Sequence, residues 1–185
     1  NKCFKFVHND LHSSNVMFQK TNQEHLYYKI NNKYYKIPLF GKITKIIDFA
    51  RATFKVNNTH IFSDVFDEEG EASGQYSYPE IDSSTLIGCE HKPNPSFDLA
   101  RLATTIIDYL DDPEYDLVRK MVKSWTKNDE GIYIVDSPDS DFSLYVDLAQ
   151  TCHNAVPIEV LNSIFFKRFE ILEKNIPNDV HVFEY

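Results

Sequence analysis

The sequence predicts an α+β domain that is mainly α-helical and carries small β-hairpins. Residues 16–47 contain short runs of β-branched and aromatic residues between turn residues, a pattern that is typical of strands. Residues 96–162 contain apolar residues that recur every three or four positions, a pattern that is typical of amphipathic helices. The 185 residues are enough for one hydrophobic core, and we expect a single domain over residues 1–185.

Three apolar runs near the start of the chain predict short strands, at residues 4–7, 16–18 and 43–47. The tetrapeptide Tyr-Tyr-Lys-Ile occurs at residues 27–30 and again at 34–37, on either side of Asn31-Asn32-Lys33. Because Asn tolerates the left-handed backbone that a tight turn requires, these repeats predict a β-hairpin that ends at Pro38 and Gly41. We expect an elongated hairpin at the edge of a sheet.

The second half of the chain predicts helices, at residues 96–110, 114–126, 140–153 and 158–162. Pro95 and Ser96 precede the first of these helices, and its wide apolar face predicts a buried central helix. We expect Trp125 to lie in the core. For residues 165–185, the sequence leaves extended and helical structure equally open.

Composition argues against several classes of protein. The formal net charge is −9, whereas a nucleic-acid-binding protein needs a basic surface, so we expect no nucleic-acid partner. No apolar run is long enough to cross a membrane, so we expect no membrane partner. The scattered cysteines fit neither a zinc site nor a disulfide framework, which favours a reducing, cytoplasmic location; they are Cys3, Cys89 and Cys152.

The residues that carry chemistry lie in two motifs. The first is His8-Asn9-Asp10 followed by Asn15, with apolar β-formers on both sides, and the second is Asp48-Phe49 after an apolar run. A hydroxyl that attacks a phosphoryl group needs a carboxylate near its proton, which Asp10 supplies. Mg²⁺ takes oxygen ligands from carboxylates and amides, and Asn15 and Asp48 are such donors. The alternative explanation is an Asp/Asn cluster in a surface turn.

Together the two motifs resemble the catalytic loop and the metal-binding loop of protein-kinase-like phosphotransferases. The resemblance implies ATP and Mg²⁺ as cofactors, with both held by Asn15 and Asp48. It implies Asp10 as the catalytic base and His12 as a second catalytic residue. It also implies structural support for the two loops from three residues, namely His8, Phe49 and Asp98, the last of which bonds the catalytic-loop backbone from the start of the first helix.

Further similarity is to the serine/threonine protein kinases of large nucleocytoplasmic DNA viruses. It is carried by residues 8–12, the Tyr-Tyr-Lys hairpin, residues 45–49 and residues 96–102. The resemblance implies a C-terminal lobe, because no Gly-rich loop of the N-terminal lobe is found in the chain. We therefore expect this lobe alone to be inactive, a protein substrate as partner besides ATP, and a location in the host-cell cytoplasm or virion.

Three positions depart from the family pattern. Asn9 stands where the family has an Arg that reads a phosphorylated activation loop. His12 stands where serine/threonine kinases have Lys. The resulting motif, His-Asn-Asp-Leu-His at residues 8–12, is closer to that of small-molecule kinases of the aminoglycoside and choline type. Ala50 replaces the Gly after Asp-Phe, which removes backbone freedom. The expected function is a Ser/Thr protein kinase, and the alternatives are a small-molecule kinase or a pseudokinase that binds partners.

The resemblance assigns residues 52–96 to an activation and substrate-binding segment. Within it, Tyr78-Pro79-Glu80 is a weak counterpart of the family's Ala-Pro-Glu. The segment also holds an acidic cluster, which predicts a solvated loop face, with attraction of basic substrates as the alternative. The members of this cluster are Asp64, Asp67, Glu68, Glu69 and Glu71.

Overall fold

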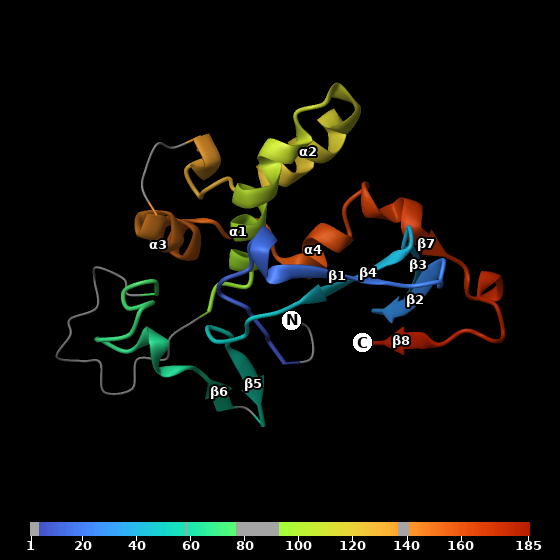
Figure 1. The fold of residues 1–185 in the computed structure, drawn as a ribbon, viewed down its shortest axis with the longest axis horizontal. Coiled ribbons are helices and arrows are strands. Elements are labelled where there is room, and N and C mark those ends of the chain that lie inside the picture. The colour runs from blue at the N-terminus through green and yellow to red at the C-terminus, as the bar shows by residue number, and fades with distance from the viewer. Residues whose placement is uncertain (1–3, 58, 77–92, 137–140) are drawn as a thin grey trace.

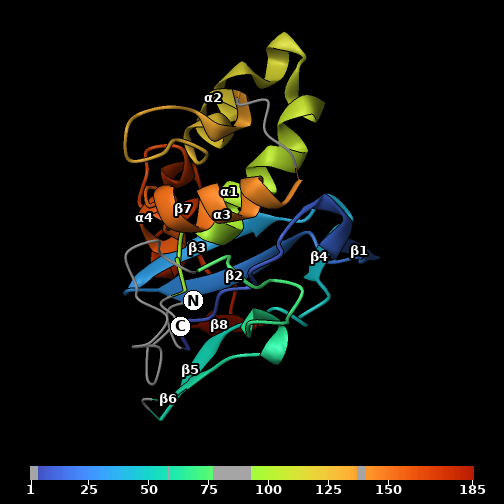
Figure 2. The ribbon, with the colours of Figure 1, turned by 90° about the vertical axis from the view of Figure 1, so that its left-hand side faces the viewer.

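The computed structural model describes residues 4–57, 59–76, 93–136 and 141–185, and it combines helices with small sheets (Figure 1). In Figure 2 the helices lie towards one end of the molecule, and β5 and β6 lie towards the other. The prediction of a mixed α+β fold is confirmed, whereas a mainly helical content and a C-terminal lobe stay predictions. In these described ranges, every helix is too short or too polar to span a membrane.

The strands predicted at residues 16–18 and 43–47 pair with each other. Strand β1 (Val16–Lys20) forms an antiparallel ladder with β4 (Lys42–Ile46), in which Val16 lies opposite Ile46. The Ile47 N–H donates to the Asn15 carbonyl at 3.0 Å and extends this pairing by one step. The chain segments that carry Asn15 and Asp48 are therefore neighbours at one end of the ladder.

The repeated tetrapeptides form the hairpin that the sequence predicts. Strand β2 (His25–Ile30) pairs with β3 (Lys33–Pro38) in antiparallel fashion. Asn31 and Asn32 have φ of 50° and 63°, so both residues of the two-residue turn are left-handed, as a tight hairpin turn requires. Lys33, which the sequence analysis placed in the turn, is the first residue of β3.

The hairpin lies at the centre of a sheet and not at its edge, which corrects the prediction. Strand β7 (Glu170–Ile171) pairs with β3, and β8 (Val182–Glu184) runs parallel to β2, so the strand order is β7-β3-β2-β8 (Figure 1). The C-terminal segment is thus extended where it pairs, and it covers both edges of the hairpin.

The predicted strand over residues 4–7 is wrong. Lys5 has a φ of 49°, which turns the chain, and the pairing there is a single antiparallel bridge between Val7 and Thr53. The two residues exchange both backbone hydrogen bonds, at 2.9 and 2.8 Å. Beyond this bridge, β5 (Phe54–Val56) and β6 (Thr59–Ile61) form a short antiparallel pair that the sequence analysis did not predict.

All four predicted helices are present; the first three are shorter than predicted, and the fourth begins and ends one residue earlier. They are α1 (Phe97–Ile106), α2 (Asp116–Ser124), α3 (Asp141–Thr151) and α4 (Pro157–Leu161). A 3₁₀ turn over Ile107–Leu110 continues α1, and another over Pro113–Tyr115 precedes α2, so the predicted ranges included these turns. Trp125 is buried, as predicted, in a small cluster that it shares with Ala103, Val122 and Ala155.

The main hydrophobic core forms where α1 and α3 meet the N-terminal segment. Phe97 of α1, Leu148 of α3 and Val7 belong to one cluster of buried side chains. The buried Asn94 amide strengthens this junction, because its Nδ2 contacts three carbonyls near the end of α3, including that of Cys152 at 2.7 Å. These carbonyls are left without helical partners when a helix ends. The beginning of α1 is therefore fixed to α3 by both packing and hydrogen bonds.

We predict that Leu148→Ala lowers the free energy of unfolding by about 2–5 kcal/mol, because it leaves a cavity in this core. The side chain of Leu148 is fully buried in α3. Leu117→Ala is the matched control, since that leucine is 63% exposed on α2, and its effect should stay within about 0.5 kcal/mol. Urea unfolding followed by circular dichroism measures both. Equal losses for the two variants would contradict this description of the core.

Candidate functional site

Asp98, in the first turn of α1, holds the backbone of the loop that carries the first motif. Its Oδ2 accepts from the His8 N–H at 2.8 Å, and its Oδ1 accepts from the Asn9 N–H at 3.0 Å. Burial raises the pKa of Asp98, and the two backbone hydrogen bonds oppose this rise. The contact that the resemblance implied for Asp98 is therefore present. Asp10 therefore directly follows two residues whose backbone N–H groups are bound to Asp98.

Thr105 gives the same loop a second attachment to α1. Its Oγ1 accepts from the Ser13 N–H at 3.0 Å. Thr105 follows Asp98 by seven positions, and residues seven apart lie on one face of an α-helix. Thr105 was not predicted as a site residue, and the only signal in the sequence is its seven-residue spacing from Asp98, which Arg101 and Thr104 on the same helix obscure.

Asn9 ties the loop to the segment that follows Asp48. Its Nδ2 donates to the Arg51 carbonyl at 2.9 Å and to Thr53 Oγ1 at 3.1 Å, while its Oδ1 accepts a hydrogen bond from the Tyr76 hydroxyl. The side chain is fully buried, and the backbone is left-handed with a φ of 63°. In the sequence Asn9 is notable only as the loss of an Arg charge, whereas in the structure its side chain makes hydrogen bonds to four residues.

His8 connects the loop to the second motif. The buried His8 ring places Nε2 2.8 Å from the Ile47 carbonyl, which accepts a hydrogen bond when Nε2 carries the proton. The His8 and Phe49 ring centroids are 5.4 Å apart, and Phe49 also contacts Phe6 at 6.0 Å. His8 and Phe6 thus both contact the turn that carries Asp48 and Phe49. Phe49 remains 53% exposed, so it covers this turn only in part.

Asn15 and Asp48 offer two oxygen donors from neighbouring segments. The Asn15 Nδ2 donates to the Asp10 carbonyl at 3.0 Å and lies 3.2 Å from His12 Nε2, which leaves its Oδ1 on the opposite side of the amide. Asp48 is exposed and left-handed, with a φ of 62°. An amide and a carboxylate oxygen fit Mg²⁺, which keeps several waters or phosphate oxygens in its shell. In the described part of the chain, no cluster of three His, Cys, Asp or Glu side chains forms a metal site.

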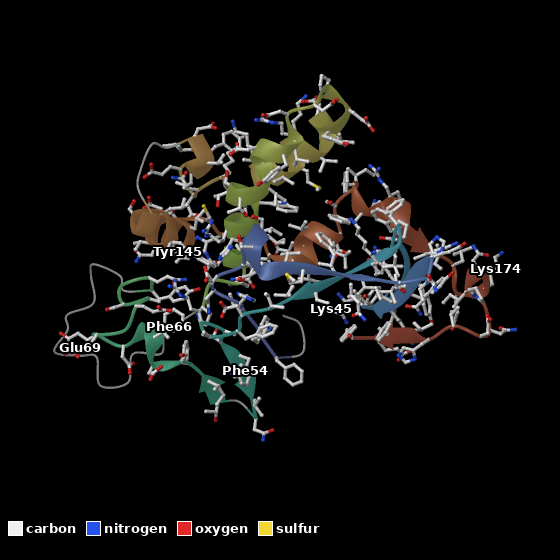
Figure 3. All side chains as sticks on the ribbon, in the orientation of Figure 1. Lys45, Phe54, Phe66, Glu69, Tyr145 and Lys174 are labelled. Atoms are coloured by element: carbon white, nitrogen blue, oxygen red, sulfur yellow. The ribbon has the colours of Figure 1, made fainter. Side chains whose placement is uncertain are left out.

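The Asp10 carboxylate contacts two side chains. Its Oδ1 accepts a hydrogen bond of 2.6 Å from the Tyr145 hydroxyl and lies 3.8 Å from His12 Nε2. Tyr145 projects from α3 towards the N-terminal segment (Figure 3). Burial and, secondarily, the Asp10 bond raise the pKa of Tyr145. Tyr145 lies within the helix predicted at residues 140–153, and its contact with Asp10 was not predicted, because the sequence offers no local signal for it.

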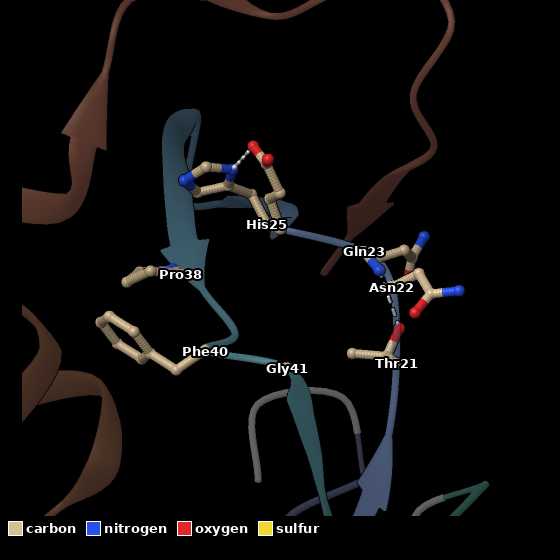
Figure 4. Close-up of a pocket in the computed structure, with 8 residues that line it drawn as sticks. Thr21, Asn22, Gln23, His25, Pro38, Phe40 and Gly41 are labelled. Carbon is tan, nitrogen blue, oxygen red and sulfur yellow. Dashed lines mark hydrogen bonds and ion pairs between the residues drawn. The ribbon is translucent and has the colours of Figure 1, made fainter.

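A separate hollow of about 350 Å³ lies between the two chain segments that connect the β1–β4 ladder to the β2–β3 hairpin (Figure 4). Thr21–His25 and Phe40–Gly41, together with Pro38, line it. None of the site residues named above contributes to this wall. The hollow is therefore distinct from the candidate site at Asp10.

The acidic cluster of residues 64–71 is exposed, as a solvated loop face requires. Glu71 lies 3.4 Å from Arg51, which follows the second motif closely. The Tyr78-Pro79-Glu80 motif lies outside the described residues, and so do Cys3, Cys89 and the central part of the predicted activation segment.

The site brings together the Asp10 carboxylate, the side-chain oxygens of Asn15 and Asp48 and a loop fixed to α1, and a phosphotransferase site requires groups of these kinds. The comparisons agree with this class. Over 73 residues the chain is 36% identical to mouse serine/threonine-protein kinase haspin and 34% identical to the bovine protein, each over 40% of the chain. It is 25% identical to the haspin homolog of Drosophila melanogaster over 126 residues, or 64% of the chain.

These similarities support a protein-kinase-like relationship. The matched region spans about a tenth of the length of the mouse and bovine proteins and 22% of the Drosophila protein. No family model matches the chain.

We predict that Asp98→Asn lowers the free energy of unfolding by about 1–3 kcal/mol. The amide nitrogen of the new side chain would face a backbone N–H, so that a buried donor loses its partner. Asp108→Asn is the control, because Asp108 is exposed in the 3₁₀ turn that follows the same helix. Urea unfolding measures both variants. A loss no larger than that of the control would contradict the anchoring role of Asp98.

Proposed function

We propose that the protein is an ATP-dependent phosphotransferase that transfers the γ-phosphoryl group of ATP to a Ser or Thr hydroxyl of a protein. One observation carries this proposal: the loop around Asp10 and the turn at Asp48 meet at the end of the β1–β4 ladder, and buried side chains fix both. The similarity to haspin kinases supports protein hydroxyls as the acceptors. A viral origin and a location in the host-cell cytoplasm or virion stay predictions.

Each site residue has a role in this proposal. Asp10 accepts the proton of the acceptor hydroxyl. Asn15 Oδ1 and the Asp48 carboxylate hold Mg²⁺, which neutralises charge on the ATP phosphates when it is bound. His12, next to Asp10, faces the transferring phosphate at the position of the family's Lys. Catalysis of this kind depends on positioning and electrostatics, so a rigid loop is its main requirement.

His12 favours a second candidate, a kinase that acts on a small-molecule hydroxyl. His12 Nε2 lies 3.8 Å from Asp10 Oδ1 and 3.2 Å from the Asn15 amide nitrogen, so the imidazole is part of the site. Turnover of [γ-³²P]ATP with Ser/Thr peptide libraries, compared with aminoglycoside and choline acceptors, distinguishes the two candidates. Label in peptides alone supports the protein kinase.

We predict that Asp48→Asn in the full-length protein reduces Mg-ATP turnover by at least about 100-fold, because the site loses its charged metal ligand. Asp48 is exposed, so the melting temperature should not change. Asp67→Asn is the control, since Asp67 is also exposed but belongs to the acidic cluster. Initial rates at saturating ATP test the prediction. Unchanged turnover in Asp48→Asn would exclude the proposed metal site.

We also predict that activity does not depend on phosphorylation of residues 52–96. The usual switch pairs a loop phosphate with an Arg beside the catalytic Asp. Here that position is the neutral Asn9, whose side chain is already bonded, and nearby Arg51 lies beside Glu71. Phosphatase treatment of active full-length protein should leave the rate unchanged. A large loss that rephosphorylation within residues 52–96 restores would contradict this prediction.

A further inference from the structure

The Tyr145 hydroxyl donates a hydrogen bond to the Asp10 carboxylate, although the two residues lie far apart in the chain. The distance of 2.6 Å between Tyr145 Oη and Asp10 Oδ1 is that of a charge-assisted hydrogen bond, because ordinary O–H···O bonds are mostly longer. The two residues are 135 positions apart, and α3 brings them together. The contact is therefore a product of the tertiary fold.

Arg101 fixes the direction of the Tyr145 proton. The Arg101 Nη2 donates to Tyr145 Oη at 3.1 Å, and the guanidinium lies 4.7 Å from the centroid of the Tyr145 ring. A guanidinium is a donor only, so the Tyr145 oxygen accepts from Arg101 and directs its own O–H to the Asp10 carboxylate. Because burial raises the pKa of Tyr145, its hydroxyl keeps this proton at neutral pH.

The Tyr145 ring, like its hydroxyl, is positioned by contacts with neighbouring side chains. Its centroid lies 6.0 Å from that of Phe97, which is fully buried at the start of α1, one residue before Asp98. Arg51 also lies over the ring, at 5.4 Å from its centroid. The start of α1 thus positions both the backbone of the catalytic loop, through Asp98, and the Tyr145 ring, through Phe97.

We propose that Tyr145 is a positioning residue for phosphoryl transfer, which holds Asp10 by Oδ1 and leaves Oδ2 to accept the proton of the acceptor hydroxyl. In the described part of the chain, Asp10 Oδ2 has no hydrogen-bond partner. The acceptor oxygen forms its bond to the γ-phosphorus while the bond to the β–γ bridging oxygen breaks, and ADP leaves with that electron pair. This inference rests on the proposed kinase function.

The test is Tyr145→Phe in the full-length protein, which keeps the ring and removes only the hydroxyl. A hydrogen bond to a charged group contributes about 1.5–3 kcal/mol, so kcat should fall roughly 10- to 100-fold. The KM values for ATP and for the acceptor peptide should not change, because the proposal gives Tyr145 a role through Asp10 and not through binding of either substrate. Tyr133→Phe is the matched control, since Lys123 lies 4.9 Å from its ring in a comparable cation–π contact away from Asp10. That control should keep the wild-type kcat.

Two further measurements separate the possible results. Arg101→Lys removes the planar donor that orients the Tyr145 hydroxyl, and it should lower kcat less than Tyr145→Phe does, again without a change in KM. Melting temperatures show whether a lower kcat reflects unfolding. Wild-type kcat in Tyr145→Phe, or a rise in kcat, would overturn the positioning role while the kinase function stands. No turnover by the wild-type protein with any acceptor would overturn the proposed function and this inference with it.

Discussion

The site depends on the hydrogen bonds between one partly buried carboxylate, that of Asp98, and two backbone N–H groups. Asp98 accepts from His8 and Asn9, and it follows Phe97, whose ring is fully buried in the core. The loop around Asp10 therefore takes its position from the buried core. Hydrogen bonds to a charged acceptor contribute about 1.5–3 kcal/mol each, enough to hold the left-handed backbone of Asn9. If this contact were lost, the loop would have to be held by weaker contacts.

The sequence predicted those parts of the fold whose signals are local. The Asn31-Asn32 turn and the apolar periodicity of α1 and α3 each depend on residues within a few positions of one another. The strands β7 and β8 could not be predicted, because they are two and three residues long and pair with β3 and β2 more than a hundred positions away. Their partners are set by where the chain returns after α4, which local composition does not encode.

The same distinction applies to the candidate site. His8, Asp10 and Asn15 could be chosen because their spacing is fixed by one short loop, and Asp48 because it ends an apolar run. The contact between Tyr145 and Asp10 could not be found in this way. In the sequence, Tyr145 falls among apolar residues at helical spacing and reads as a core residue. Only the packing of α1 against α3 shows that its hydroxyl meets a carboxylate.

Asn9 shows why a neutral side chain suits this version of the loop. The atoms around it are the carbonyls of Val7 and Arg51 and the hydroxyls of Thr53 and Tyr76. Its Nδ2 shares two donor hydrogens among the two carbonyls and the Thr53 hydroxyl, and its Oδ1 accepts from the Tyr76 hydroxyl. An Arg in the same fully buried position would place a charge among neutral acceptors, with the desolvation cost of a buried, unpaired ion. The Asn9 side chain therefore adds a buried neutral network to the Asp98 contact, and hydrogen bonds between neutral groups are not screened by salt.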